Sequence, residues 1–225
     1  MRVFFQKRKN YKVRPCTTRS NLVKGVMLFF LLSFLSVPFV FFPFSASALT
    51  FNVSRLDSLT SGLVGYWTFD GKDTTWNTNK TLDKSGNGNH GTMTNMSTTT
   101  SPVIGKIGQG LKFDGTNDVA DINNNSSVQL TVGTVSAWIK TSNAGTSYRG
   151  IVIKEDAYGM FLKDNVLGIY DWGADTFRST GVNLADGAWH HVLESFNSGV
   201  ANGTQLYIDG VSRLTTQMTI SNQTK

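Results

Sequence analysis

From residue 63 onward, apolar and polar positions alternate in short runs that predict β-strands. The runs are rich in Val, Ile, Phe, Tyr and Trp, and clusters of Gly, Asn, Asp, Ser and Thr separate them, as in strands joined by turns. The expected strands are 63–69, 110–114, 118–122, 134–140, 149–154, 158–163, 166–171, 189–196 and 204–209. No stretch keeps a helical period over three turns. The predicted fold class is therefore all-β, a sandwich of antiparallel strands.

Alternation and turn chemistry add detail to this prediction. In the run 135–140, Val135, Ala137 and Ile139 share one face, and Ser136, Trp138 and Lys140 share the other. Asp164-Asn165 and Asp209-Gly210 are two-residue pairs typical of tight hairpins. The second hairpin predicts a further strand that begins at Val211.

The N-terminal 48 residues have a different pattern. Residues 1–24 contain eight Lys or Arg and no Asp or Glu, an apolar run follows over 26–44, and 45–48 reads Ser-Ala-Ser-Ala. This order predicts a secretory signal peptide over 1–48, cleaved after Ala48. The alternative is an uncleaved membrane anchor, because a span needs about 20 apolar residues. Residues 49–62 are expected to form a polar leader before the domain.

The signal segment also explains the basic charge of the chain. The whole chain carries a formal charge of +6, but residues 49–225 contain 13 basic and 15 acidic side chains. A nucleic-acid partner is therefore not supported. The single cysteine, Cys16, lies inside the signal segment, so the mature part has no disulfide. We expect a secreted protein or one displayed at the cell surface, with the membrane involved only if the signal segment is retained.

Five motifs follow one another in a fixed order. They are 65–70 (GYWTFD), 83–91 (DKSGNGNHG), 110–118 (GLKFDGTND), 187–192 (GAWHHV) and 206–210 (LYIDG). Together they closely resemble the LamG-like jelly-roll family, relatives of laminin G and concanavalin A-type domains. The resemblance implies a concanavalin A-like β-sandwich jelly roll of two antiparallel sheets.

The resemblance covers residues 63–210 and lacks its C-terminal end. In the family, about two more strands follow the last hairpin, and the final strand closes the sheet against the first. We therefore interpret residues 63–225 as a domain that is incomplete at its C-terminus. The first strand is then expected to expose an unpaired edge.

A calcium site is one chemical interpretation of the Gly/Asn-rich loop 83–91. Calcium takes about six to eight oxygen ligands from carboxylates, amides and carbonyls. The resemblance implies a structural calcium here, and the matching positions are Asp70, Asn89 and Asp114. The alternative is a turn-rich loop that binds no ion.

Glycan binding is predicted from aromatic residues in or beside loops. Sugars stack their apolar faces on aromatic rings, and the candidates are Tyr148, Tyr170 and Trp172, with Trp172 as the best platform. The neighbouring Asp171 and Arg149 complete the candidate site as polar groups. The alternative is that Tyr170 and Trp172 belong to the rim of the core. Trp67, Trp138 and Trp189 are expected to lie in the core.

Catalysis is the alternative to binding, and the sequence gives it little support. A glycosidase needs a pair of carboxyl groups, and the only two glutamates, Glu155 and Glu194, lie on different predicted elements. His190 and His191 are adjacent on a strand, so their side chains point to opposite faces and cannot bind one ion together. We expect a non-catalytic recognition domain whose partner is a glycan. The other candidate is a protein-binding or structural module on the cell surface.

Overall fold

The computed structural model describes residues 3–6, 61–143, 145–220 and 223, all in one compact unit formed by Met1–Lys9 and Asp57–Lys225. Most of the predicted signal peptide and leader lies outside the described residues. The strands are β1 (Val3–Gln6), β2 (Leu63–Trp67), β3 (Thr74–Thr75), β4 (Lys80–Thr81), β5 (Gly91–Thr94), β6 (Pro102–Ile104), β7 (Gln109–Leu111), β8 (Val119–Ile122), β9 (Val132–Lys140), β10 (Arg149–Lys154), β11 (Tyr158–Lys163), β12 (Val166–Asp171), β13 (Thr176–Asn183), β14 (Trp189–Asn197), β15 (Thr204–Ile208) and β16 (Val211–Thr216). Two single 3₁₀ turns, Gly71–Asp73 and Ser126–Val128, accompany them.

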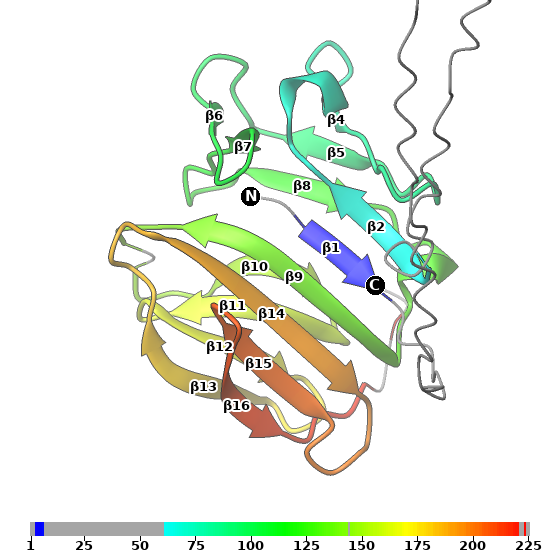
Figure 1. The fold of residues 1–225 in the computed structure, drawn as a ribbon, viewed down its shortest axis with the longest axis vertical. Coiled ribbons are helices and arrows are strands. Elements are labelled where there is room, and N and C mark those ends of the chain that lie inside the picture. Colours follow the sequence, from blue (N-terminus) through cyan, green and yellow to red (C-terminus); the bar gives the residue numbers. More distant parts are fainter. Residues whose placement is uncertain (1–2, 7–60, 144, 221–222, 224–225) are drawn as a thin grey trace, which may run out of the picture. The chain divides into compact units, whose positions relative to one another are not determined.

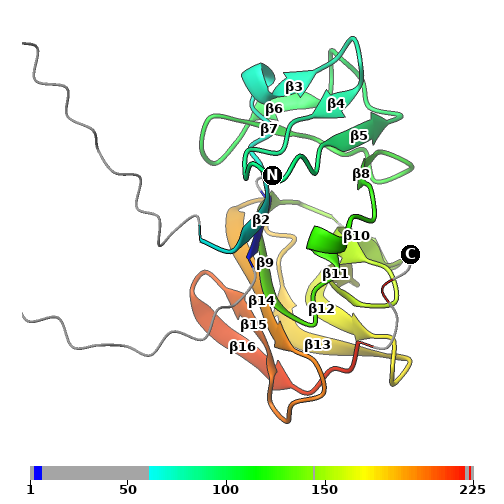
Figure 2. The same ribbon diagram turned by 90° about the vertical axis from the view of Figure 1, so that its right-hand side faces the viewer.

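Two antiparallel sheets form a sandwich (Figures 1 and 2). One sheet has the strand order β16-β15-β14-β9-β1-β2, and the other has the order β10-β11-β12-β13. A smaller sheet, β3-β4-β5-β8, and the hairpin β6-β7 are formed by residues 74–122. This arrangement confirms the predicted all-β jelly-roll sandwich. Within the described residues, no helix is long and apolar enough to cross a membrane.

The core between the two sheets follows from the alternation of each strand. Val135 and Ala137 of β9 share one face, as predicted; both are fully buried and belong to one cluster with residues of β11 and β12. Tyr158 of β11 stacks on Phe196 of β14 with ring centroids 4.6 Å apart. The Tyr158 hydroxyl donates to the Val128 carbonyl, so this buried polar atom is satisfied. Its burial raises the pKa of Tyr158.

The local turn predictions are confirmed. Asp164, Asn165, Asp209 and Gly210 all have positive φ, between 50° and 80°, as two-residue hairpins require. The strand predicted from Val211 is β16. Strand β13 was missed because Gly181, with φ of 72°, interrupts its apolar pattern.

Strand β2, the first strand that the sequence predicts, pairs with another strand along one edge and lies at the end of the six-stranded sheet. Strand β1, from the segment that the sequence assigns to the signal peptide, lies between β2 and β9 and pairs antiparallel with both. Phe5 is opposite Gly65 on one side and Val135 on the other. The β2 edge is therefore covered by a segment almost 60 residues earlier in the chain, which no local pattern could indicate.

Candidate ligand-binding site

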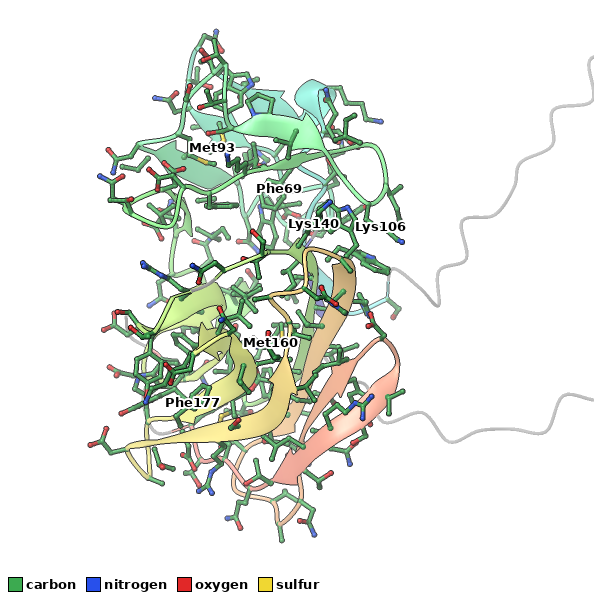
Figure 3. The ribbon with its side chains drawn as sticks, turned by 90° about the vertical axis from the view of Figure 1, so that its left-hand side faces the viewer. Phe69, Met93, Lys106, Lys140, Met160 and Phe177 are labelled. Carbon is green, nitrogen blue, oxygen red and sulfur yellow. The ribbon has the colours of Figure 1, made fainter. Side chains whose placement is uncertain are left out.

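An aromatic cluster covers the face of the four-stranded sheet that points away from the core. Alternation along β11 and β12 places Met160 and Ile169 inside the sandwich, so Phe161 and Tyr170 lie on the opposite face. Figure 3 shows Phe177 on this outer side and Met160 on the core side. The aromatic cluster consists of Tyr148, Phe161, Tyr170, Trp172 and Phe177.

Tyr148 is the centre of the cluster. Its ring makes edge contacts with Phe161, Tyr170 and Phe177, at centroid distances of 6.1, 5.8 and 5.5 Å. Trp172 extends the cluster, 5.5 Å from Tyr170 and 5.9 Å from Phe161. Tyr148 is 42% exposed, so part of this ring is open to solvent.

Glycine makes room for these rings on the sheet. A Cβ at Gly168 would lie 2.4 Å from the Phe177 ring, so any side chain there would displace Phe177. The cluster is therefore packed against backbone, which holds the rings in fixed positions.

Polar groups surround the cluster. The Lys163 ammonium lies 4.8 Å from the centre of the Tyr148 ring and 5.9 Å from that of Phe177. The Tyr170 hydroxyl donates to Asp175, and this hydrogen bond raises the pKa of Tyr170. The cluster thus combines ring faces with charged and hydrogen-bonding groups.

The structure brings together three of the five predicted site residues. Tyr148, Tyr170 and Trp172 are in the cluster, and neither Tyr170 nor Trp172 belongs to the core. Asp171 is only 3% exposed and forms an ion pair with Arg178, whose Nη2 lies 2.9 Å from its Oδ2. Asp171 therefore links β12 to β13 through this ion pair and is not open to a ligand. Arg149 is exposed, and its guanidinium donates to the carbonyl of Gly115.

A groove adjoins the cluster at Tyr148 and Arg149. It has a volume of about 890 Å³ and lies between the loop 112–118, the end of β9 and the segment 141–150. Sites for small ligands typically measure about 300–1,000 Å³. Trp138 and Trp189 line it and are half-buried, so the expectation that both belong to the core is wrong. Both lie on the outer faces of their strands, because Ala137 and Val192 occupy the inner positions.

The three residues predicted to bind calcium have separate sets of partners. Asp70 Oδ1 accepts from the Gln109 amide, and Asp114 Oδ1 accepts from the Thr116 amide. Asn89 is buried, and its Oδ1 accepts from Asn125 and Ser127. Within the described parts of the chain, no group of three or more His, Cys, Asp or Glu is arranged to hold a metal ion.

Asp83 organises the loop that suggested calcium, and the sequence analysis did not single it out. Its carboxylate accepts hydrogen bonds from the backbone amides of Tyr66, Ser85 and Asn89 at 2.8–3.0 Å. The Trp67 indole donates to the Asn89 carbonyl. Protein donors thus shape this loop, and the calcium interpretation stays a prediction.

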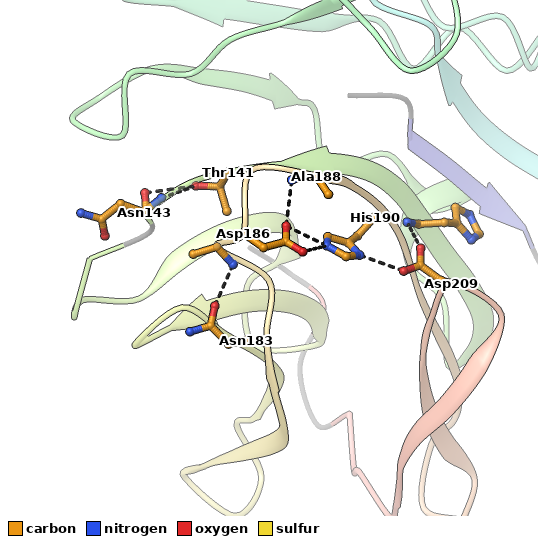
Figure 4. Close-up of polar contacts among 9 residues, drawn as sticks. Thr141, Asn143, Asn183, Asp186, Ala188, His190 and Asp209 are labelled. Atoms are coloured by element: carbon orange, nitrogen blue, oxygen red, sulfur yellow. Dashed lines mark hydrogen bonds and ion pairs between the residues drawn. The ribbon is translucent and has the colours of Figure 1, made fainter.

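His190 forms a polar connection beside the groove (Figure 4). Its Nδ1 lies 2.8 Å from Asp209 Oδ2, and its Nε2 lies 3.1 Å from Asp186 Oδ1. The hydrogen bond to Asp209 and the bond to Asp186 raise the pKa of His190, although burial opposes them. Both ring nitrogens donate only in the protonated imidazolium. The protonated ring therefore joins the 209–210 turn to the loop whose Gly187 lines the groove.

The His190 connection gives a pH-dependent prediction. Because its pKa is raised above 6.5 in the folded state, its contribution to stability is complete below pH 6.5. That contribution is lost as the pH rises through the folded-state pKa. We expect His190→Gln to lower the free energy of unfolding by about 1 kcal/mol at pH 5.5 and by less at pH 8.5.

Urea unfolding at the two pH values measures this effect. His191→Gln is the matched control, because the His191 ring faces Trp138, with centroids 5.2 Å apart, and burial lowers the pKa of His191. An equal loss at both pH values in His190→Gln would show that protonation of His190 has no part in the connection.

Comparison with known proteins agrees with the fold. The family described as the concanavalin A-like lectin/glucanases superfamily matches residues 114–225, and this part of the chain belongs to it. A search of curated proteins finds no match. Among solved structures, the chain is similar to the crystal structure of the binding domain of Paraclostridial Mosquitocidal Protein 1, with 17% sequence identity and a TM-score of 0.49. The match covers 64% of this chain and 40% of that one, so the chain spans less than half of that protein.

Proposed function

We propose that this domain is an exported, non-catalytic module that binds carbohydrate through the aromatic cluster. The observation that carries the proposal is the gathering of Tyr148, Tyr170 and Trp172 on one outer sheet face, beside a groove. Rings of this kind offer apolar faces to the C–H faces of sugars, and their polar atoms meet hydroxyl groups. A superfamily named for lectins and glucanases is consistent with this function.

The geometry favours a glycan over a protein partner. A groove of about 890 Å³ lined by both polar and aromatic side chains suits a small ligand. A protein-binding module would instead present a broad, flat apolar patch. The exposed large apolar side chains include Ile104, Val119 and Val211, which lie on three different strands.

The two glutamates support a non-catalytic role. Glu194 is fully buried between the sheets, and Glu155 is exposed in the turn after β10. A glycosidase needs two carboxyl groups on either side of the bond that it cleaves. A buried Glu194 cannot reach a sugar bound at the surface, so these residues do not form such a pair.

A glycan array tests the proposal. The expected result is binding that falls by about two- to tenfold in Trp172→Ala, because stacking on one ring contributes about 0.5–1.5 kcal/mol beyond its area. Tyr207→Ala is the control, because Tyr207 is a half-buried aromatic residue of β15 in the other sheet. Equal losses in the two variants would place the ligand elsewhere.

Repeating the array in EDTA tests calcium separately. Stacking on rings needs no ion, so binding through the cluster alone persists in EDTA. A loss of binding together with a lower melting temperature would establish the structural calcium that the family resemblance implies. No binding by folded protein would favour the protein-interaction alternative.

A further inference from the structure

We infer that the ligand is an acidic oligosaccharide whose anionic groups bind in the groove next to the aromatic cluster. The inference rests on the proposed carbohydrate binding and names its ligand class. It is carried by cationic side chains that gather around Trp138, although residues 49–225 carry a small negative formal charge.

The cations lie on two sides of the groove. Lys140 follows Trp138 by two residues on β9, so both side chains lie on the outer face of that strand. The Lys106 ammonium lies 5.2 Å from the Trp138 ring centre, and Figure 3 labels Lys106 and Lys140 in the same region. Lys112 and Arg149 line the groove as well.

These lysines have no carboxylate partners. Among the described residues, no ion pair joins Lys106, Lys112 or Lys140 to an acidic side chain. Their charges are therefore available to a ligand, and a lysine ammonium offers three donors to carboxylate or sulfate oxygens.

Two aspartates also line the groove, and the loop backbone uses both of them. Asp114 accepts from the amide of Thr116, and Asp118 Oδ2 accepts from the amide of Asp114 at 2.8 Å. These bonds hold the 114–118 turn in place, and Arg149 donates to its Gly115 carbonyl. The groove and its border thus carry four cationic groups and two carboxylates, and both carboxylates are hydrogen-bonded within the 114–118 turn. The cationic groups are Lys106, Lys112, Lys140 and Arg149.

Tyr148 connects the aromatic cluster with the groove. Tyr148 belongs both to the aromatic cluster and to the lining of the groove, which Trp189 lines from the side of β14. Lys163, above Tyr148, adds a cation on the cluster side. A sugar chain that stacks on Tyr148 therefore has ammonium groups on both sides for its carboxylate or sulfate groups. A neutral glycan would leave these charges without partners.

Binding of three oligosaccharides to the full chain tests the inference. The probes are a heparin-derived hexasaccharide, an oligogalacturonate and a neutral cello-oligosaccharide, so that sulfate, carboxylate and uncharged sugars are compared. We expect tighter binding of at least one acidic probe, with an affinity that falls as salt is added. The two acidic probes distinguish sulfate from carboxylate recognition.

The double variant Lys112→Ala/Lys140→Ala locates the site. We expect it to bind the acidic probe about tenfold or more weakly, because each lost charge-assisted hydrogen bond weakens binding. Lys80→Ala is the matched control, since Lys80 is an exposed lysine on β4 that does not line the groove. Circular dichroism and the melting temperature show that each variant is folded.

The outcomes separate this inference from the proposed function. Equal affinity in the double variant and in Lys80→Ala would overturn the groove as the anionic site. Binding of only the neutral probe, lost in Trp172→Ala, would overturn the acidic ligand class while carbohydrate binding stands. Absence of binding to any probe by folded protein would overturn both.

Discussion

Replacing Glu194 by glutamine will remove most of the pH dependence of stability between pH 4.5 and 8. Glu194 is completely buried, and neither carboxyl oxygen has a hydrogen-bond partner of good geometry among the described residues. Burial raises the pKa of Glu194 from 4.5 to about 8, and the nearby Gly159 amide offsets only part of this effect.

The sign of the effect follows from proton linkage. Below pH 4.5, Glu194 is protonated in both the folded and unfolded states, so this group then costs no stability. Between pH 4.5 and 8, the unfolded chain ionises while the folded protein keeps the proton, so the free energy of unfolding falls. Each pH unit costs about 1.4 kcal/mol, which gives a loss of about 3 kcal/mol by pH 7.

Urea unfolding at several pH values measures this loss. Subtracting the curve of Glu194→Gln from that of the wild type cancels the His190 contribution, which is common to both proteins. Glu155→Gln is the matched control, because Glu155 is the other glutamate of the described residues and is exposed. If Glu194→Gln and wild type have parallel stability curves, Glu194 is not the ionising group.

Removing residues 1–48 will destabilise the six-stranded sheet. Strand β1 pairs with β2 and β9, and its loss leaves two strand edges without partners. Buried backbone groups that lose their hydrogen bonds each cost about 1–3 kcal/mol. We therefore expect a chain that begins at Leu49 to melt at a lower temperature and to associate in a concentration-dependent way, because open strand edges pair with other chains.

Proline substitutions separate β1 from the rest of the removed segment. In the full chain, Phe5→Pro removes a backbone donor between Gly65 and Val135. Amide exchange in β2 and β9 is then expected to speed up by about 10- to 100-fold. Phe41→Pro, in the apolar run outside the described residues, is the control. Unchanged amide exchange in Phe5→Pro would show that β1 does not pair with β2 and β9.

This prediction has a consequence for processing. Cleavage after Ala48, as the sequence predicts, would take β1 away from the domain. The place between β2 and β9 would then need another strand.

Features that depend on neighbouring residues could be predicted from the sequence. The Asp164-Asn165 and Asp209-Gly210 turns need only residues that tolerate positive φ, and both are found where expected. The common face of Val135, Ala137 and Ile139 follows from strand alternation, and all three are buried. The fold class could therefore be predicted from local pattern and motif order.

Features that depend on distant segments could not be predicted. Strand β1 pairs with β2, although the two strands are almost 60 residues apart in the sequence. The burial of Asp171 depends on Arg178, which the pairing of β12 with β13 brings close to it. Trp189 lines a groove because the loop 112–118 lies opposite it, and its apolar character alone suggested the core.

The most direct test of carbohydrate binding is an NMR titration of the full chain with the oligosaccharide that binds best. We predict that the largest shifts will arise in Tyr148, Tyr170 and Trp172, and in the indole signals of Trp138 and Trp189. Tyr207, on the opposite sheet, will not shift. Shifts concentrated on β15 and β16, with the aromatic cluster unchanged, would contradict the proposed site.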